Sequence, residues 1–142
     1  MPRLQIDLPE TFTFSTEIPL YTWHINSGGH LDNAQLGSII SETRARFFQT
    51  LGYGLRDLGG PDIGMVVADA AYIYKTEAFY GEVMVVNMTA RDLSRCGCDL
   101  VFLVTDRATG REVARGKCGV VFVDRTIGRP TGIPPKLLAQ LT

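Results

Sequence analysis

The sequence predicts an α+β fold in which one long central helix is wrapped by an antiparallel sheet of five or six strands. A helical run with signals at both ends covers residues 33–51, and four strand-like segments follow one another between residues 64 and 124. With 142 residues, 45% of them hydrophobic, the chain can bury one sizeable core. No change in composition indicates a second unit, so we expect a single domain over residues 1–142.

The first strand is expected at residues 11–20. Apolar side chains alternate there with polar ones, which is the period of a half-buried strand. The apolar positions are Phe12, Phe14, Ile18 and Leu20. Pro19 cannot donate a hydrogen bond to a neighbouring strand, so this strand should end at a sheet edge or at a bulge.

The central helix is predicted from about Asn33 to Leu51. Asp32 followed three residues later by Gln35 has the form of a capping box, and Gly52 stands where a helix commonly ends. Apolar residues at helical spacing make one face of this helix, namely Leu36, Ile39, Ile40, Phe47 and Leu51.

A pair of glycines leads into the helix. Gly28 and Gly29 allow the backbone to approach a ligand closely, because they have no side chain. The first amides of a helix lack partners within the helix and carry the positive end of its dipole. This segment is therefore suited to bind an oxyanion or a polarised carbonyl.

The remainder of the chain alternates strand and turn signals. Residues 52–62 are rich in glycine and predict a connection, after which four segments are rich in Val, Ile, Phe, Tyr and Thr. These segments are residues 64–74, 82–94, 97–107 and 111–124. Short reversals between them predict antiparallel pairing, and a short helix on the surface is expected at residues 135–141.

The composition excludes several classes of protein. A formal net charge of −1 gives no broad basic surface for nucleic acid. No segment approaches the roughly 20 apolar residues of a membrane span, and no signal peptide is recognisable. Cys96, Cys98 and Cys118 are an odd number without metal-site spacing, which favours reduced thiols. We expect a cytoplasmic protein without metal or cofactor that binds neither nucleic acid nor membrane.

The predicted architecture also implies self-association. One helix cannot shield both faces of a sheet of five or six strands, and an isolated antiparallel sheet leaves its edge strands open. Pairing of two sheets through their edges removes one open edge from each. We therefore expect a homodimer or a dimer of dimers.

Four short segments together resemble a known family. They are residues 26–34 (NSGGHLDNA), 42–44 (ETR), 74–78 (YKTEA) and 81–82 (GE). The chain resembles the 4-hydroxybenzoyl-CoA thioesterase type of hot-dog fold protein, whose pattern is an aspartate, two spacers, Gly-His, one spacer and Asn-Asn-Ala, followed later by Glu-Ala-Arg. The resemblance covers nearly the whole chain and implies the hot-dog fold.

The resemblance implies hydrolysis of a thioester, either an acyl-CoA or an acyl group on a carrier protein, in a cleft between two subunits. Backbone amides at the helix start would polarise the carbonyl, here at Gly29 and His30. The position of the family's catalytic aspartate, a nucleophile or general base, is occupied by Asn26.

Asn26 differs from the family pattern at the position of the catalytic carboxylate. An amide cannot take up a proton near neutral pH, so Asn26 can orient a water or a carbonyl but cannot act as the base. The missing function could fall to Glu42 on the helix, to Asp32, or to a positioned water alone. Two other classes stay open: a protein that binds acyl thioesters without cleaving them, and a hydratase or dehydratase that uses His24 or His30 with Glu42.

Further residues are candidates for substrate binding. Gly28, Asp32, Asn33, Tyr74 and Lys75 lie in the segments that carry the resemblance. Asp32 and Asn33 also suit helix caps, and Tyr74 suits an ordinary strand position. The cations available for CoA phosphates, which the sequence does not distinguish, are Lys75, Arg91, Arg95, Arg125 and Arg129.

Overall fold

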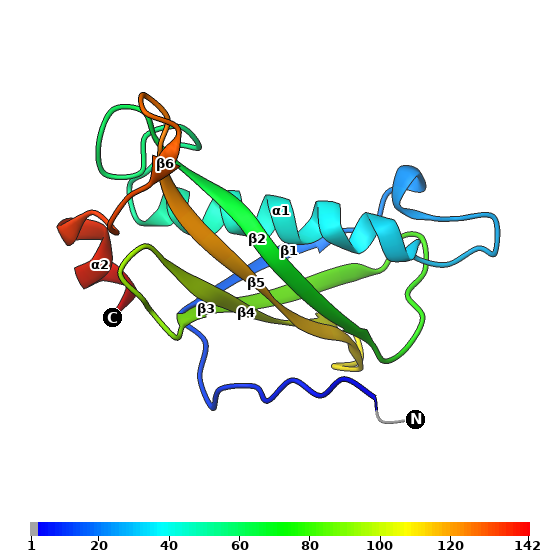
Figure 1. Ribbon diagram of the computed structural model, residues 1–142. Helices are drawn as coiled ribbons and strands as arrows, with labels where there is room; N and C mark the ends of the chain where they lie inside the picture. Colours follow the sequence, from blue (N-terminus) through cyan, green and yellow to red (C-terminus); the bar gives the residue numbers. More distant parts are fainter. Residues whose placement is uncertain (1–2) are drawn as a thin grey trace.

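A computed structural model describes residues 3–142, and it shows the helix α1 (Asn33–Thr50) packed against a six-stranded antiparallel sheet (Figure 1). The strands are β1 (Phe14–Pro19), β2 (Ile63–Tyr74), β3 (Val83–Arg91), β4 (Gly97–Asp106), β5 (Glu112–Asp124) and β6 (Arg129–Pro130). A 3-10 helix, η1 (Thr22–His24), precedes α1, and a short helix, α2 (Pro135–Leu141), ends the chain. The predicted α+β class and hot-dog fold are confirmed.

The strands follow the order β1-β3-β4-β5-β2, with β6 paired to the end of β5. Consecutive strands β3, β4 and β5 form the predicted antiparallel meander. The ladder between β2 and β5 is interrupted by a bulge between Val67 and Asp69. Because β1 and β2 are the two ends of the strand order, one long side of β2 has no neighbouring strand among the described residues.

Two predicted strands are shorter in the structure by more than one residue. The first begins at Phe14 rather than at residue 11, and pairs with β3 from Phe14 opposite Met88. The strand predicted at 82–94 ends at Arg91, because Asp92 adopts a φ of 51°, in the left-handed region that breaks a strand.

The predicted helix cap is half correct. Asp32 is the N-cap, and its side chain accepts a hydrogen bond from the Ala34 amide at 3.4 Å. The reciprocal bond of a capping box is absent from the described chain, because the Asp32 N–H already donates to the His24 carbonyl at 2.8 Å. Gln35 instead accepts a hydrogen bond from the Ser38 hydroxyl. At the other end Gly52, with a φ of 99°, follows the helix as predicted.

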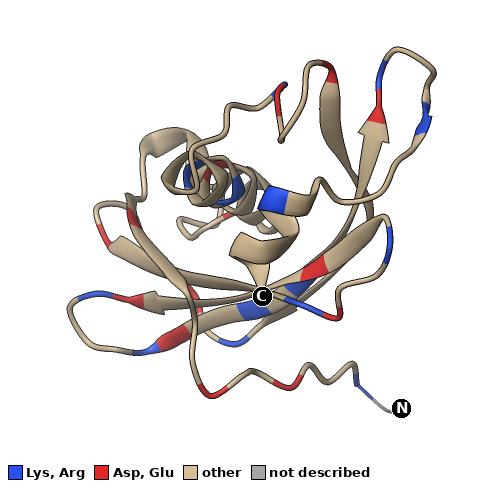
Figure 2. Cartoon of the chain, turned by 90° about the vertical axis from the view of Figure 1, so that its left-hand side faces the viewer, with Lys and Arg blue, Asp and Glu red and all other residues tan. Residues whose placement is uncertain are grey.

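The core lies between α1 and the inner face of the sheet. The helix contributes Leu36, Ile39, Ile40, Phe47 and Phe48, all buried. The sheet contributes alternate residues of its strands, including Met84, Met88, Leu100, Phe102 and Phe122. Figure 2, in which α1 is seen nearly end-on, shows how the sheet bends around the helix. This burial holds α1 in place along its length.

The C-terminal helix corrects one prediction. We expected α2 to lie on the surface, but Leu137 is fully buried and Leu141 is 9% exposed. These two side chains are four residues apart, so they share one face of the helix, which packs into the core. Gln140 adds two hydrogen bonds, accepting from the Tyr53 hydroxyl at 2.6 Å and donating to the Leu51 carbonyl at 2.9 Å.

Charged residues of both signs are interspersed over the chain (Figure 2). Several form ion pairs across the sheet, such as Arg107 with Glu17 at 2.9 Å and Lys117 with Asp99 at 3.1 Å. None of the helices within residues 3–142 combines the length and the apolar character that crossing a bilayer requires.

His24 has a structural role at the end of η1. Its ring is buried, and its Nδ1 accepts a hydrogen bond from the Tyr21 amide at 2.9 Å. Burial lowers the pKa of His24 from its ordinary value of 6.5, because the charged form is poorly solvated there. A neutral imidazole is therefore part of the folded structure.

Replacing Leu137 by Ala should lower the free energy of unfolding by about 2–5 kcal/mol, because it leaves a cavity in the core. Leu138 lies on the same helix but is 39% exposed, so Leu138→Ala should change the stability by less than about 0.5 kcal/mol. Urea unfolding of both variants measures the difference. Equal effects would show that α2 does not belong to the core.

The folded protein should lose stability as the pH falls, partly through His24. Because the folded pKa of His24 lies below 6.5, its neutral form stabilises the fold fully above that pH and loses this contribution as the pH falls toward the folded value. Melting temperatures between pH 7.5 and 5.0 should therefore fall more for the wild type than for His24→Asn, whose amide oxygen can still accept from Tyr21. Other titrating groups are common to both proteins, and parallel curves would contradict this role.

Candidate active site

The loop between η1 and α1 is closed by its own backbone. Asn26 donates its N–H to the His30 carbonyl, and the Gly29 N–H donates to the Asn26 carbonyl, both at 3.0 Å. Gly29 has a φ of 85°, which favours glycine, and no atom lies within 4 Å of the position that a Cβ would take. The turn is therefore tight enough to hold the Asn26 side chain in one orientation.

The Asn26 side chain is bound by the loop that carries it. Its Oδ1 accepts hydrogen bonds from the Gly28 amide at 3.0 Å and from the His30 amide at 3.4 Å. Because both donors are N–H groups, the oxygen and the nitrogen of the amide are distinguished by this network. The Nδ2 donor of Asn26 is left for another partner.

The amides at the helix start are engaged to different degrees. The Gly29 N–H is held within the loop, whereas the bond of the His30 N–H, at 3.4 Å, is long for a hydrogen bond. Leu31 and Asp32 donate to the Ala78 and His24 carbonyls. Among the described residues, the Asn33 N–H at the first helical position has no acceptor. The helix start thus retains a free donor and a weakly held one.

A cavity of about 350 Å³ opens beside this loop, and we call it the loop cavity. Its lining comprises Asn26, His30, Leu31, Asn33, Tyr74, Lys75, Thr76, Glu77, Ala78 and Val113. The structure thereby brings together five of the residues that the sequence analysis selected, from the loop, the helix start and the end of β2. The Tyr74 hydroxyl donates to the Asn33 carbonyl at 2.7 Å and so joins β2 to the start of α1.

His30 and Glu77 form the ionisable pair of the loop cavity. The His30 Nε2 lies 3.9 Å from Glu77 Oε1, and its Nδ1 lies 3.3 Å from the Leu31 carbonyl. With the proton on Nδ1 donated to that carbonyl, Nε2 is left to accept a proton. The sequence analysis did not select Glu77, although it lies within the segment 74–78 that carries the resemblance.

Glu42 lies apart from the loop cavity. Its carboxylate pairs with Arg46 at 2.8 Å on an exposed face of α1. Arg46 also donates to the Thr16 hydroxyl and to the Glu17 carbonyl of β1, which fixes the pair on that side of the helix. Within one chain, Glu42 and Asn26 therefore do not line the same cavity.

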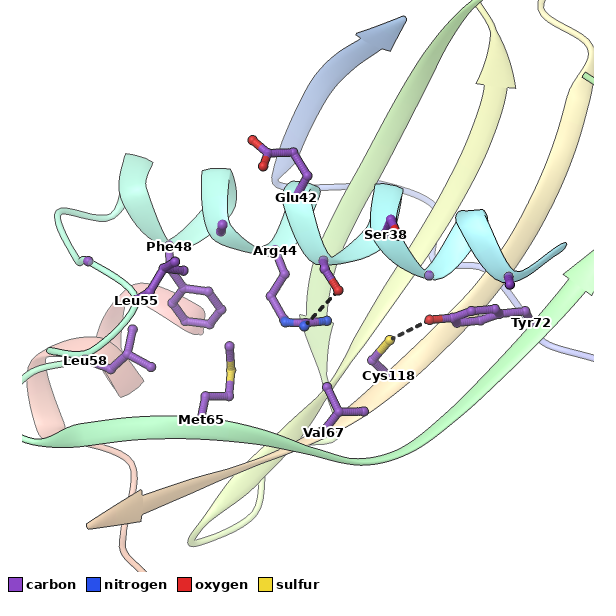
Figure 3. Close-up of a pocket in the computed structure, with 15 residues that line it drawn as sticks. Ser38, Glu42, Arg44, Phe48, Leu55, Leu58, Met65, Val67, Tyr72 and Cys118 are labelled. Carbon is purple, nitrogen blue, oxygen red and sulfur yellow. Dashed lines mark hydrogen bonds between the residues drawn. The ribbon is translucent and has the colours of Figure 1, made fainter. Parts of the chain in front are cut away.

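A second and larger cavity, of about 790 Å³, lies between α1 and β2, and we call it the helix–β2 cavity (Figure 3). Its lining comprises Ala34, Gly37, Ser38, Ser41, Glu42, Arg44, Ala45, Phe48, Gly54, Leu55, Leu58, Met65, Val67, Tyr72 and Cys118. Figure 3 shows the Arg44 side chain pointing into this space and the Glu42 carboxylate pointing away from it.

Two neutral polar groups face each other in the helix–β2 cavity. The Tyr72 hydroxyl lies 3.9 Å from the Cys118 sulfur. Burial and the neighbouring Cys118 raise the pKa of Tyr72 to about 12, and burial raises the pKa of the Cys118 thiol. Both groups are therefore protonated near neutral pH, and the thiol is not activated as a nucleophile.

The remaining predicted residues have structural positions. Gly28 packs against His30, since a Cβ at Gly28 would lie 3.2 Å from the His30 Nε2. Asp32 caps α1 and lines neither cavity within the described part of the chain. Of the cations considered for CoA phosphates, Lys75 lines the loop cavity. Residues 3–142 contain no cluster of three His, Cys, Asp or Glu side chains that could hold a metal ion.

Solved structures share this architecture. The PA2801 protein from Pseudomonas aeruginosa matches with a TM-score of 0.84 and 22% identity, over 93% of this chain and 100% of that chain. A 1,4-dihydroxy-2-naphthoyl-CoA thioesterase from Synechocystis matches with a TM-score of 0.82 and 15% identity, over 90% and 94% of the two chains. A Staphylococcus aureus protein solved in complex with CoA matches with a TM-score of 0.82 and 16% identity, over 96% and 85%. At these identities the similarity concerns the fold.

The sequence itself identifies the family. A comparison with curated proteins finds no match. The model of the thioesterase-like superfamily, however, matches residues 20–141, a span that contains α1 and both cavities. The chain therefore belongs to the thioesterase-like superfamily.

Proposed function

We propose that the protein hydrolyses acyl-CoA thioesters in the loop cavity. The observation that carries the proposal is that Asn26, His30 and Asn33, the first residue of α1, line this one space, and that the Asn33 N–H has no acceptor among the described residues. Membership of the thioesterase-like superfamily supports the reaction type. The Staphylococcus aureus structure with CoA supports CoA as the carrier of the acyl group.

The start of α1 would polarise the thioester carbonyl. As the tetrahedral intermediate forms, negative charge develops on the carbonyl oxygen and is stabilised by positioned donors in a site that excludes water. The Asn33 N–H and the Asn26 Nδ2 are available without breaking any bond of the loop. The His30 N–H can join them, since its bond to Asn26 is long. The helix dipole acts in the same direction.

A base other than Asn26 must activate the water. His30 lies in the same cavity, and histidine is the usual general base near neutral pH. Its Nε2 would take the proton as the water oxygen attacks the carbonyl carbon. The C–S bond then breaks, and the proton passes to the departing sulfur, giving a carboxylic acid and a free thiol. Glu77 at 3.9 Å would stabilise the imidazolium that forms between these steps.

We further propose that the working unit contains two copies of the chain. Val66 and Val67 of the edge strand β2 are 45% and 46% exposed, which is unusual for large apolar residues of a strand. Pairing through β2 would cover them and would flank both cavities, because Tyr72 and Tyr74 of β2 line one each. Two such dimers could assemble further into a tetramer.

A second function follows from Asn26. Because its Oδ1 is held by backbone amides and its Nδ2 is only a donor, Asn26 supplies binding interactions but no chemistry. A protein with this site could bind an acyl thioester without cleaving it. A hydratase or dehydratase that pairs a histidine with Glu42 is disfavoured within one chain, since His24 is buried and Glu42 does not line the loop cavity that contains His30.

Purified protein should release free thiol from at least one member of a panel of short, aromatic and long acyl-CoAs. A thiol-reactive dye that absorbs on reaction follows the release continuously. Binding of acyl-CoA by calorimetry without thiol release on any substrate would instead identify the non-catalytic binder. Hydration of an enoyl-CoA would assign the protein to the hydratase class.

Variants of the loop cavity should separate the roles of its residues. His30→Gln should lower kcat by about 10²–10⁴, the usual value of general-base catalysis. Asn26→Asp should raise kcat about 10-fold, because the new carboxylate keeps an acceptor for the Gly28 amide and adds a base, while the Asn33 and His30 N–H donors remain when the Nδ2 donor is lost. If kcat is unchanged in both variants but falls strongly in Glu42→Gln, the general base is Glu42 and not His30.

A further inference from the structure

The helix–β2 cavity contains an arginine that has no acidic partner. Arg44 points into the cavity, and its Nη2 lies 3.4 Å from the Ser41 hydroxyl (Figure 3). Four arginines pair with carboxylates, namely Arg46, Arg107, Arg111 and Arg115, but none of these lines the helix–β2 cavity. Among residues 3–142, no carboxylate oxygen lies within 4.0 Å of the Arg44 guanidinium.

The surroundings of Arg44 explain why it stays unpaired. Glu42, two residues earlier, is held by Arg46 on another side of the helix. Asp69 is the acidic residue of β2, and its Oδ1 accepts from the Gly119 amide at 3.1 Å. The neighbouring Tyr72 and Cys118 are kept neutral by their raised pKa values. A guanidinium beside neutral walls favours an anion from outside the chain.

The rest of the cavity suits an apolar body with one charged end. Phe48, Leu58, Met65 and Val67 supply apolar walls, and Arg44 is the one basic residue among the lining residues of the described chain. A CoA diphosphate needs two or three cations, so this cavity is a poor phosphate site. Its volume of about 790 Å³ is typical of a pocket for a small molecule.

Nearby residues of α1 and β2 line the two cavities. At the start of α1, Asn33 lines the loop cavity and the next residue, Ala34, lines the helix–β2 cavity. On β2, Tyr74 lines the loop cavity and Tyr72 lines the helix–β2 cavity. The Arg44 guanidinium lies at the level of Ser41, its hydrogen-bond partner. At 1.5 Å per residue, Ser41 is about 12 Å along α1 from Asn33. An acyl group with its carbonyl at the helix start could therefore extend toward Arg44.

We propose that the helix–β2 cavity binds the acyl group of a thioester whose far end carries a carboxylate, and that Arg44 selects for that carboxylate. The substrate class is a medium-length ω-carboxyacyl thioester, in which an apolar chain separates the thioester from the second acid group. This inference rests on the proposed thioesterase function, since it describes the acyl half of the same substrate. Arg44 is a specificity-determining residue that binds the substrate away from the reacting carbonyl.

The test compares octanedioyl-CoA with octanoyl-CoA, which differ in the terminal carboxylate. The wild type should show a kcat/KM about 10- to 100-fold higher for octanedioyl-CoA, as expected for a charge-assisted hydrogen bond. Arg44→Gln should reduce this ratio to about one, and Arg44→Lys should restore part of it. The matched control is Arg46→Gln, because Arg46 lies on the same helix but does not line the cavity, so its ratio should equal that of the wild type.

Several outcomes would overturn the proposal. They are a wild-type ratio near one, an equal loss for both substrates in Arg44→Gln, weaker binding of free CoA by that variant, and a change of its oligomeric state in size-exclusion chromatography. The last two would assign Arg44 to phosphate binding or to contact with a second copy of the chain.

Calorimetry with the non-hydrolysable thioether analogues of both compounds separates this inference from the proposed function. If no acyl-CoA is cleaved, tighter binding of the octanedioyl analogue that is lost in Arg44→Gln would retain the inference while the hydrolase function fails. Equal binding of the two analogues by the wild type would overturn the inference regardless of turnover.

Discussion

The burial of the apolar face of α1 against the sheet is the constraint on which the rest of the structure depends. Because Leu36, Ile40 and Phe48 are fixed in the core, the rotation of the helix about its axis is fixed as well. That rotation decides which polar residues face β2 and which face β1. The same packing fixes where the start of α1 lies relative to the end of β2, so that the Tyr74 hydroxyl donates to the Asn33 carbonyl. Both cavities are consequences of this one packing arrangement.

Asn26 shows how one side chain can hold a loop in shape without being able to take up a proton. An oxygen at this position binds the Gly28 and His30 amides and closes the turn, a task that a carboxylate or an amide can perform equally. Acid–base catalysis at this position, in contrast, needs the carboxylate, since an amide cannot take up a proton near neutral pH. The position can therefore hold the loop in shape without supplying a base, and the ionisable His30 and Glu77 stand in the same cavity.

The parts of the fold that depend on local patterns could be predicted from the sequence. The period of α1, its start after Asp32 and the meander of strands follow from side-chain spacing and turn residues. The errors concern tertiary contacts. The predicted capping box does not form, because the Asp32 amide donates to the His24 carbonyl, and α2, expected on the surface, buries Leu137 in the core. Glu77 was missed for the same reason, since only the folded loop brings it to His30.

The opposite behaviour of two arginines on α1 follows from helical geometry. Residues four apart share a side of a helix, whereas residues two apart do not. Glu42 and Arg46 can therefore pair with each other, and Thr16 of β1 helps to hold them. Arg44 lies between them in sequence but faces β2, together with Ser41 and Phe48. On the β1 side of the helix, Glu42 and Arg46 thus neutralise each other. On the β2 side, the positive charge of Arg44 remains. Arg44 is half-buried and points into the helix–β2 cavity, so its guanidinium can bind a carboxylate that enters there.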